Sequence, residues 1–121
     1  MSELLVSDSL RREDFGAVTV MRVTVPLLRS DETTETLFHH LNAVVNDVGR
    51  TSLVLNFAGV VSMSSTAIGK LVILMRKVRM AGGRLALCRL TPTMLGIMQS
   101  SYLAEIIPIY VDEQVAVRSF A

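Results

Sequence analysis

Short apolar runs alternate with amphipathic segments along most of this chain. The runs at residues 18–25, 52–57 and 84–88 have the length and the apolar content of strands in a sheet that helices cover. The segments that follow them carry apolar residues at every third or fourth position, which is typical of helices with one buried face. Strands that alternate with helices need crossover connections and therefore acquire parallel neighbours. The pattern predicts one α/β domain with a mixed, mostly parallel sheet of about five strands and about four helices.

Residues that favour the ends of helices and strands support this order. Capping residues precede each of the four predicted helices: Ser30 and Asp31, Ser64 to Thr66, Thr91 with Pro92, and Asp112. The first helix is expected to carry an apolar stripe from Leu37 to Val48 and to stop at Gly49, and Gly82-Gly83 should end the second. Pro108 places the last strand, within residues 106–110, at an edge of the sheet.

Several classes of protein do not fit the composition. No apolar stretch approaches the roughly 18 residues that a membrane-spanning helix requires, and residues 1–12 mix charged and apolar side chains, unlike a secretory signal. The single cysteine, Cys88, leaves no partner for an internal disulfide and cannot form a cysteine-rich metal site. These features predict a soluble cytoplasmic domain that does not insert into a membrane.

The charges are distributed unevenly along the chain. All 11 acidic residues lie at or before Asp47 or at or after Glu105. Seven basic residues stand between these two positions: Arg50, Lys70, Arg76, Lys77, Arg79, Arg84 and Arg89. Such asymmetry predicts an electropositive face that suits an acidic or phosphorylated partner, unless the acidic first third neutralises it in space.

Residues with the chemistry of a catalytic or metal site are sparse. His39 and His40 are adjacent on a predicted helix, so their side chains point about 100° apart, and the chain has no third histidine. Gly82-Gly83 follows a helix and precedes a strand, which is the reverse of a phosphate-binding loop. No aromatic residue between Phe57 and Tyr102 is available to stack on bases. The sequence therefore predicts a binding protein without a metal or cofactor, and neither an enzyme nor a nucleic-acid-binding protein.

The hydroxyl-rich segment Ser64-Ser65-Thr66 lies where an apolar run gives way to a helix. The first turn of a helix leaves backbone N–H groups unpaired and carries a partial positive charge. A hydroxyl at this position can cap the helix, and a phosphate on it would be stabilised by the same amides and the same dipole. The residues themselves leave both uses open.

The order of several short motifs resembles STAS domains of the anti-sigma factor antagonist type. In chain order these motifs are residues 53–57, 64–71, 82–83, 85–88 and 90–92, followed by Leu103, Ile106, Ile109-Tyr110 and Asp112-Glu113. The resemblance extends over about residues 17 to 120. It implies a STAS domain at residues 17–121, preceded by an N-terminal segment at residues 1–16, in which the apolar residues Leu4 to Val6 predict a short first strand.

In that family, the antagonist binds an anti-sigma factor that is also a serine kinase. Phosphorylation of a serine at the start of the second helix breaks the complex, and a PP2C-type phosphatase reverses the modification. The family motif reads Asp-Ser-x-Gly-Leu-Gly, and when it is laid on this chain its serine falls on Ser65 and its last glycine on Gly69. The resemblance therefore implies a bacterial phosphoprotein that regulates transcription, with Ser65 as the modified residue and Ser64 or Thr66 as substitutes.

The resemblance also implies a partner-binding surface on and beside the second helix. We assign to it Asn56, Ser64, Thr66, Ala67, Gly69, Lys70, Ile73, Leu74, Arg76 and Lys77. Exposed apolar residues beside cations suit an interface, although Ile73 and Leu74 could instead extend the apolar stripe that faces the core.

This chain departs from the family pattern at three acidic positions, one of which, the acid that usually follows the second strand, has no clear counterpart around Leu27 to Asp31. Ser64 stands where typical members have the acid before the serine, and Asn56 stands where they have an acid on the strand. These departures leave two alternatives open. One is a non-phosphorylated STAS subunit of a membrane transporter ATPase, and the other is a scaffold subunit of a regulatory assembly. The oligomeric state does not follow from the resemblance.

Overall fold

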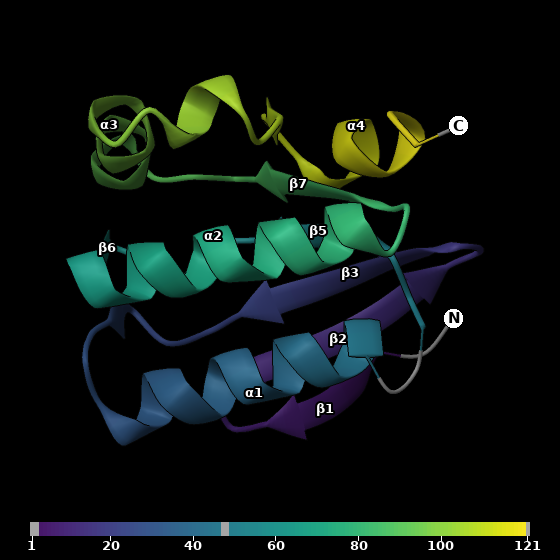
Figure 1. The fold of residues 1–121 in the computed structure, drawn as a ribbon, viewed down its shortest axis with the longest axis horizontal. Helices are drawn as coiled ribbons and strands as arrows, with labels where there is room; N and C mark the ends of the chain where they lie inside the picture. The colour runs from purple at the N-terminus through teal and green to yellow at the C-terminus, as the bar shows by residue number, and fades with distance from the viewer. Residues whose placement is uncertain (1–2, 47–48, 121) are drawn as a thin grey trace.

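The computed structural model describes residues 3–46 and 49–120, and its main sheet has six strands in the order β1-β2-β3-β5-β7-β8 (Figure 1). Their bounds are Leu4–Ser7 for β1, Leu10–Phe15 for β2, Val18–Val23 for β3, Ser52–Asn56 for β5, Arg84–Cys88 for β7 and Ile109–Tyr110 for β8. Neighbouring strands from β3 to β8 are parallel, whereas β1, β2 and β3 are joined antiparallel. The predicted mixed α/β architecture is confirmed, and β8, which directly follows Pro108, lies at the sheet edge as expected.

Helices cover both faces of this sheet. Their bounds are Glu32–Asn46 for α1, Ser65–Met80 for α2, Pro92–Ser100 for α3 and Glu113–Arg118 for α4, with a short 3-10 helix, η1, at Leu103–Glu105. In Figure 1, α1 and α2 lie side by side across one face, and their buried residues join the larger part of the core. Ala116 of α4 packs against Val20 and Val54 on the opposite face. Val48, which was expected in the stripe of the first helix, lies outside the described residues.

Predicted caps are observed at all four helices, and the cap of α2, Ser64, is described with the site below. Asp31, Thr91 and Asp112 each accept a hydrogen bond on a side-chain oxygen from the backbone N–H three residues further on, at 2.9, 3.2 and 2.9 Å. These bonds satisfy N–H groups that the first helical turn leaves without a partner. At the other end of α2, Gly82 has a φ of +82°, a left-handed conformation that strains other residues.

The sequence pattern did not indicate β2. Four of its six residues are charged, so no alternation of apolar and polar residues marks it as a strand. It forms because it pairs with β3 along its whole length. Ion pairs hold the charges: Arg12 contacts Asp14 at 3.1 Å, and Arg22 of β3 contacts Glu13 at 2.9 Å.

A second, two-stranded sheet fixes the entry to α2. It consists of β4 (Leu27–Leu28) and β6 (Ser62–Met63), which run parallel. The backbone N–H of Ser64 donates to the carbonyl oxygen of Leu28 at 2.7 Å. Strands of two residues are too short to show a periodic pattern, and for this reason the sequence did not predict them.

Candidate functional site

The three hydroxyls at the start of α2 have different surroundings. Ser64 is the N-cap, and its Oγ accepts a hydrogen bond from the backbone N–H of Ala67 at 3.2 Å. Ser65 and Thr66 are exposed in the first turn, and within the described residues neither hydroxyl takes part in a hydrogen bond. Ser64 therefore caps the helix, whereas Ser65 and Thr66 are exposed and have no part in capping it.

Exposed apolar residues lie beside this helix start. Leu27 of β4 is 37% exposed, and Val61, which precedes β6, is 50% exposed. The small sheet brings them together, and the backbone N–H of Val61 donates to the carbonyl oxygen of Pro26 at 2.7 Å. Sequence reasoning missed both residues because the segments that carry them are far apart in the chain and no local pattern joins them.

Most residues of the predicted partner-binding surface are accessible on α2 or at its start. Those exposed at least in part are Ser64, Thr66, Gly69, Lys70, Ile73, Arg76 and Lys77. Ala67 and Leu74 have no exposed area and belong to the core, so we remove them from this surface. A side chain without exposed area cannot contact a partner. Leu74 extends the core stripe, whereas Ile73 is 51% exposed and does not.

Asn56 lies away from the exposed side of α2. Alternate residues of a strand face opposite sides of the sheet, and Asn56 shares its side with Val54, which packs against α4. The side chain is 8% exposed, and its Nδ2 donates to Oε2 of Glu113 in α4 at 2.6 Å. Its Oδ1 accepts from the backbone N–H of Ala58 at 2.9 Å. Asn56 therefore helps to position α4 and is a second correction to the predicted surface.

Arg22 and Glu113 join the sheet to α4. Two nitrogens of the Arg22 guanidinium donate to the two carboxylate oxygens of Glu113, at 2.6 and 2.7 Å. The hydrogen bonds from Arg22 lower the pKa of Glu113, and the hydrogen bond from Asn56 acts in the same direction against partial burial. The two residues are 91 positions apart, so nothing in the local sequence pattern linked them.

We expect Glu113 to make the stability of the fold sensitive to acid. Its pKa is lower in the folded chain than in the unfolded chain, so its contribution is fully present above the unfolded pKa and is lost as the pH falls through the folded pKa. Glu113→Gln should lower the free energy of unfolding by about 1–2 kcal/mol at neutral pH, a value reduced because both side chains of the pair are partly solvated. The variant should also show a weaker pH dependence below about pH 4.5.

Urea unfolding at a series of pH values measures both effects. Glu105→Gln is the matched control, because Glu105 forms no ion pair among the described residues. An identical pH dependence in the wild type and in Glu113→Gln would contradict the expectation.

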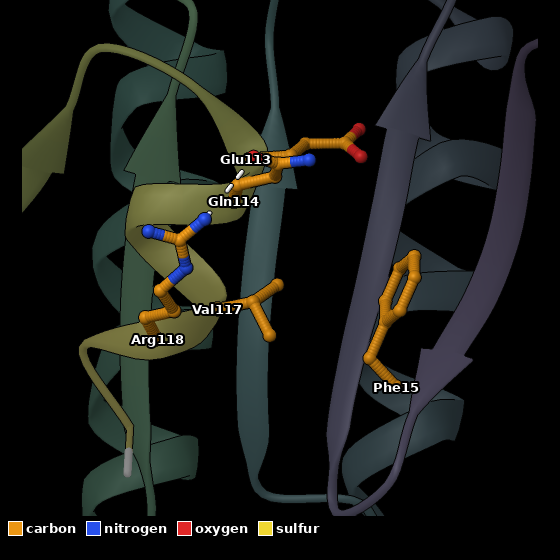
Figure 2. A pocket seen from close by; sticks show the side chains of 5 residues that line it. All are labelled: Phe15, Glu113, Gln114, Val117 and Arg118. Carbon is orange, nitrogen blue, oxygen red and sulfur yellow. Dashed lines mark hydrogen bonds between the residues drawn. The ribbon is translucent and has the colours of Figure 1, made fainter.

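A cavity of about 310 Å³ lies beside α4. Figure 2 shows Phe15 at the end of β2 and Val117 of α4 on its two sides. The acceptor oxygens in its lining are already paired: Gln114 Oε1 accepts from Arg118 at 3.2 Å, and both carboxylate oxygens of Glu113 accept from Arg22 of β3. The cavity therefore presents mainly apolar walls, and we assign no chemistry to it.

Other reactive side chains are equally constrained. Cys88 is buried at the end of β7, where desolvation and then the carboxylate of Glu113 raise the pKa of its thiol to about 12. Over residues 3–46 and 49–120, no cluster of three or more His, Cys, Asp or Glu side chains could hold a metal ion. None of the helices in the same part of the chain has the length and apolar character needed to span a bilayer.

Comparison with known proteins assigns the family. The STAS domain family matches residues 11–116, which reach from β2 into α4. The chain belongs to the STAS domain family. This confirms the resemblance drawn from the sequence, while the division of the chain after residue 16 stays a prediction. No curated protein matches this chain in sequence.

Solved structures share the fold. The anti-sigma-factor antagonist (STAS) domain protein from Planctomyces limnophilus is 23% identical, with a TM-score of 0.78 over 91% of this chain and 96% of that one. The phosphorylated form of the Bacillus cell fate determinant SpoIIAA is 21% identical, with a TM-score of 0.66 over 91% and 98%. A sulfate transporter family protein from Wolinella succinogenes is 14% identical, with a TM-score of 0.72 over 85% and 84%. At these identities the likeness establishes the fold of this STAS domain and not its partner.

Proposed function

We propose that this STAS domain is a bacterial, cytoplasmic anti-sigma factor antagonist that acts by binding a partner protein in a partner-switching circuit. The proposed partner is an anti-sigma factor that is also a serine kinase, and a PP2C-type phosphatase would act on the modified form. One observation carries the proposal: Ser65 is exposed in the first turn of α2, while the neighbouring Ser64 does the capping. A modifiable hydroxyl is thus separate from the hydroxyl that the helix requires.

A phosphate on Ser65 would change the surface without unfolding the helix. It would add about −1.5 to −2 charges at neutral pH. The unpaired N–H groups and the dipole at the start of α2 would stabilise that charge, and Ser64 would keep its hydrogen bond to Ala67. No acidic residue lies between Asp47 and Glu105, so the phosphate would be the first negative charge in that part of the sequence. The modification would therefore act on docking rather than on folding.

Variants of Ser65 test the switch. We expect Ser65→Asp to lose a partner that the wild type and Ser65→Ala both retain, with at least about a tenfold drop in the amount bound. The measurement is an affinity capture from the native cell lysate read by mass spectrometry, with mapping of phosphorylated residues to separate Ser65 from Thr66. Ser100→Asp is the matched control, because it places the same charge on an exposed serine of α3.

The other outcomes separate the alternatives. Equal capture of a serine-kinase-like protein by the wild type, Ser65→Ala and Ser65→Asp would show that Ser65 is not the switch. A transporter ATPase held equally by all baits would replace the proposal with the non-phosphorylated transporter subunit. A large stable assembly that retains every variant would favour the scaffold subunit.

A further inference from the structure

β8 leaves one edge of the main sheet open, because it is the last strand in the order and pairs with β7 alone. The backbone N–H groups of Leu87 and Arg89 donate to the carbonyl oxygens of Pro108 and Tyr110, at 2.9 and 3.2 Å. Backbone groups of alternate residues point to opposite sides of a strand, so the N–H and C=O of Ile109 point away from β7. In the described part of the chain, neither group has a hydrogen-bond partner.

Pro108 does not close this edge. A proline protects an edge strand when its missing N–H lies on the open side. The carbonyl oxygen of Pro108 accepts from Leu87, so this residue faces β7 and the donor that it lacks is on the inner side. The open side therefore keeps both the donor and the acceptor of Ile109.

Apolar surface accompanies these backbone groups. A groove of about 490 Å³ runs beside β8, and its walls are Leu90, Leu95, Ala104, Ile109, Tyr110 and Val111. Val111, which follows β8, is 86% exposed, and Ile106, which precedes it by two residues of chain, is 41% exposed. Exposed apolar residues that gather in one place are typical of a surface that another protein covers.

Charges of opposite sign lie near the two ends of β8. Arg89 lines a cavity together with Val111, and Glu105 directly precedes Ile106. Both charged side chains are exposed, and over residues 3–46 and 49–120 they form no ion pair and no hydrogen bond. In an antiparallel pair, the end of one strand lies beside the start of the other. A second copy of β8 would therefore bring its Glu105 to Arg89 of the first copy.

We propose that two copies of this chain associate through β8, with the two strands antiparallel about a twofold axis beside Ile109. The two Ile109 residues would lie opposite each other and exchange both of their backbone hydrogen bonds. Val111 of each copy would lie beside Ile106 of the other copy, and Arg89 beside Glu105. A twofold axis brings a surface against itself, so each of these contacts occurs twice.

The other edge of the sheet fits such pairing less well. β1 carries an irregularity between Leu5 and Ser7, and a bulge interrupts regular pairing at an edge. Glu3, at the start of β1, already forms ion pairs with Arg11 and Arg22. It is therefore not available to select a second copy, although the leucines of β1 are exposed.

The inference goes beyond the proposed function and does not depend on it. None of the residues that the pairing uses lies in α2, so each copy would keep its exposed Ser65. A dimer would carry two copies of the proposed switch in one assembly, and a partner with two binding sites would be held more tightly than by one copy.

Reversal of one charge should weaken the dimer, and reversal of both should restore it. Arg89→Glu would place two carboxylates together at each end of the paired strands, and Glu105→Arg would place two guanidinium groups there. We expect each variant to raise the dimer Kd at least about tenfold, and the double variant to return it to within about threefold of the wild type. Sedimentation equilibrium at low ionic strength, where charges are least screened, measures these constants.

A mixture of the two single variants gives the sharpest test. Each variant alone repels its own copy, whereas in a mixed pair a carboxylate meets a guanidinium group at both ends. We therefore expect a mixture of Arg89→Glu with Glu105→Arg to form dimers at concentrations at which neither variant does so alone. A fluorescent label on one of the two variants reports the mixed dimer by sedimentation velocity.

Arg118→Glu is the matched control, because Arg118 is exposed on α4 beside Phe15 of β2 and should leave the dimer Kd unchanged. Circular dichroism checks that every variant is folded. A wild type that stays monomeric up to about 1 mM would overturn the inference. So would a dimer that both single variants retain, because it would use another surface, such as β1. These measurements need neither a kinase nor Ser65, so their failure is distinct from failure of the proposed function.

Discussion

Gly83→Ala is expected to destabilise the fold by about 3 kcal/mol or more. A Cβ at this position would overlap the carbonyl oxygen and the Cβ of Thr51 and would lie 2.7 Å from the Thr51 carbonyl carbon. The same carbonyl oxygen accepts a hydrogen bond at 2.9 Å from the backbone N–H of Arg84, where β7 starts to pair with β5. The two backbones therefore cannot separate without opening the centre of the sheet.

Urea unfolding followed by circular dichroism measures this loss. Gly96→Ala in α3 is the matched control, since a Cβ there would meet no atom within 4 Å and the residue is helical. Alanine at that position should stabilise the domain by up to about 1 kcal/mol. An unfolding midpoint for Gly83→Ala equal to that of the wild type would show that the close approach of the two strands does not occur in solution.

Leu74→Ala is expected to cost about 3–4 kcal/mol, whereas Ile73→Ala should cost less than about 1 kcal/mol. Leu74 has no exposed area and lies in the main core, and its neighbour Ile73 is 51% exposed on the outer side of α2. Truncating a buried leucine removes its transfer free energy and leaves a cavity, whereas truncating an exposed isoleucine does neither to the same extent.

Each of these two variants is the control for the other, because both remove apolar atoms from the same turn of α2. Their free energies of unfolding come from urea titrations under identical conditions. Similar losses for Ile73→Ala and Leu74→Ala would mean that α2 is rotated about its axis relative to the structure.

Much of the fold follows from local sequence signals. The alternation of apolar runs with helical periodicity defined β3, β5, β7 and the helices between them. Pro108 placed β8 at the edge, and capping residues marked the helix starts. Each of these signals works over a few residues, because backbone hydrogen bonding in a helix and side-chain alternation in a strand are local regularities. The hydroxyls at the start of α2 belong to the same class, and the sequence placed them correctly.

These local signals could not predict contacts between segments that are far apart in the sequence. β2 is charged and becomes a strand only through its pairing with β3. The pairing of β4 with β6 brings Leu27 and Val61, which are far apart in the chain, to the start of α2. Asn56 was assigned to the partner surface because its place in the family pattern does not reveal which face of the sheet it occupies, and the structure turns it towards Glu113.

The sequence by itself determined that the chain is an α/β domain of the STAS family, with three hydroxyls at the start of its second helix and a run of cations behind them. Only the tertiary structure decided that Ser64 is the cap, that Ser65 is exposed, and that Ile73 rather than Leu74 faces outward. The physical reason is that adjacent residues of a helix point about 100° apart. When both are apolar, hydropathy cannot say which one meets the core, and that choice depends on how the helix packs against the sheet.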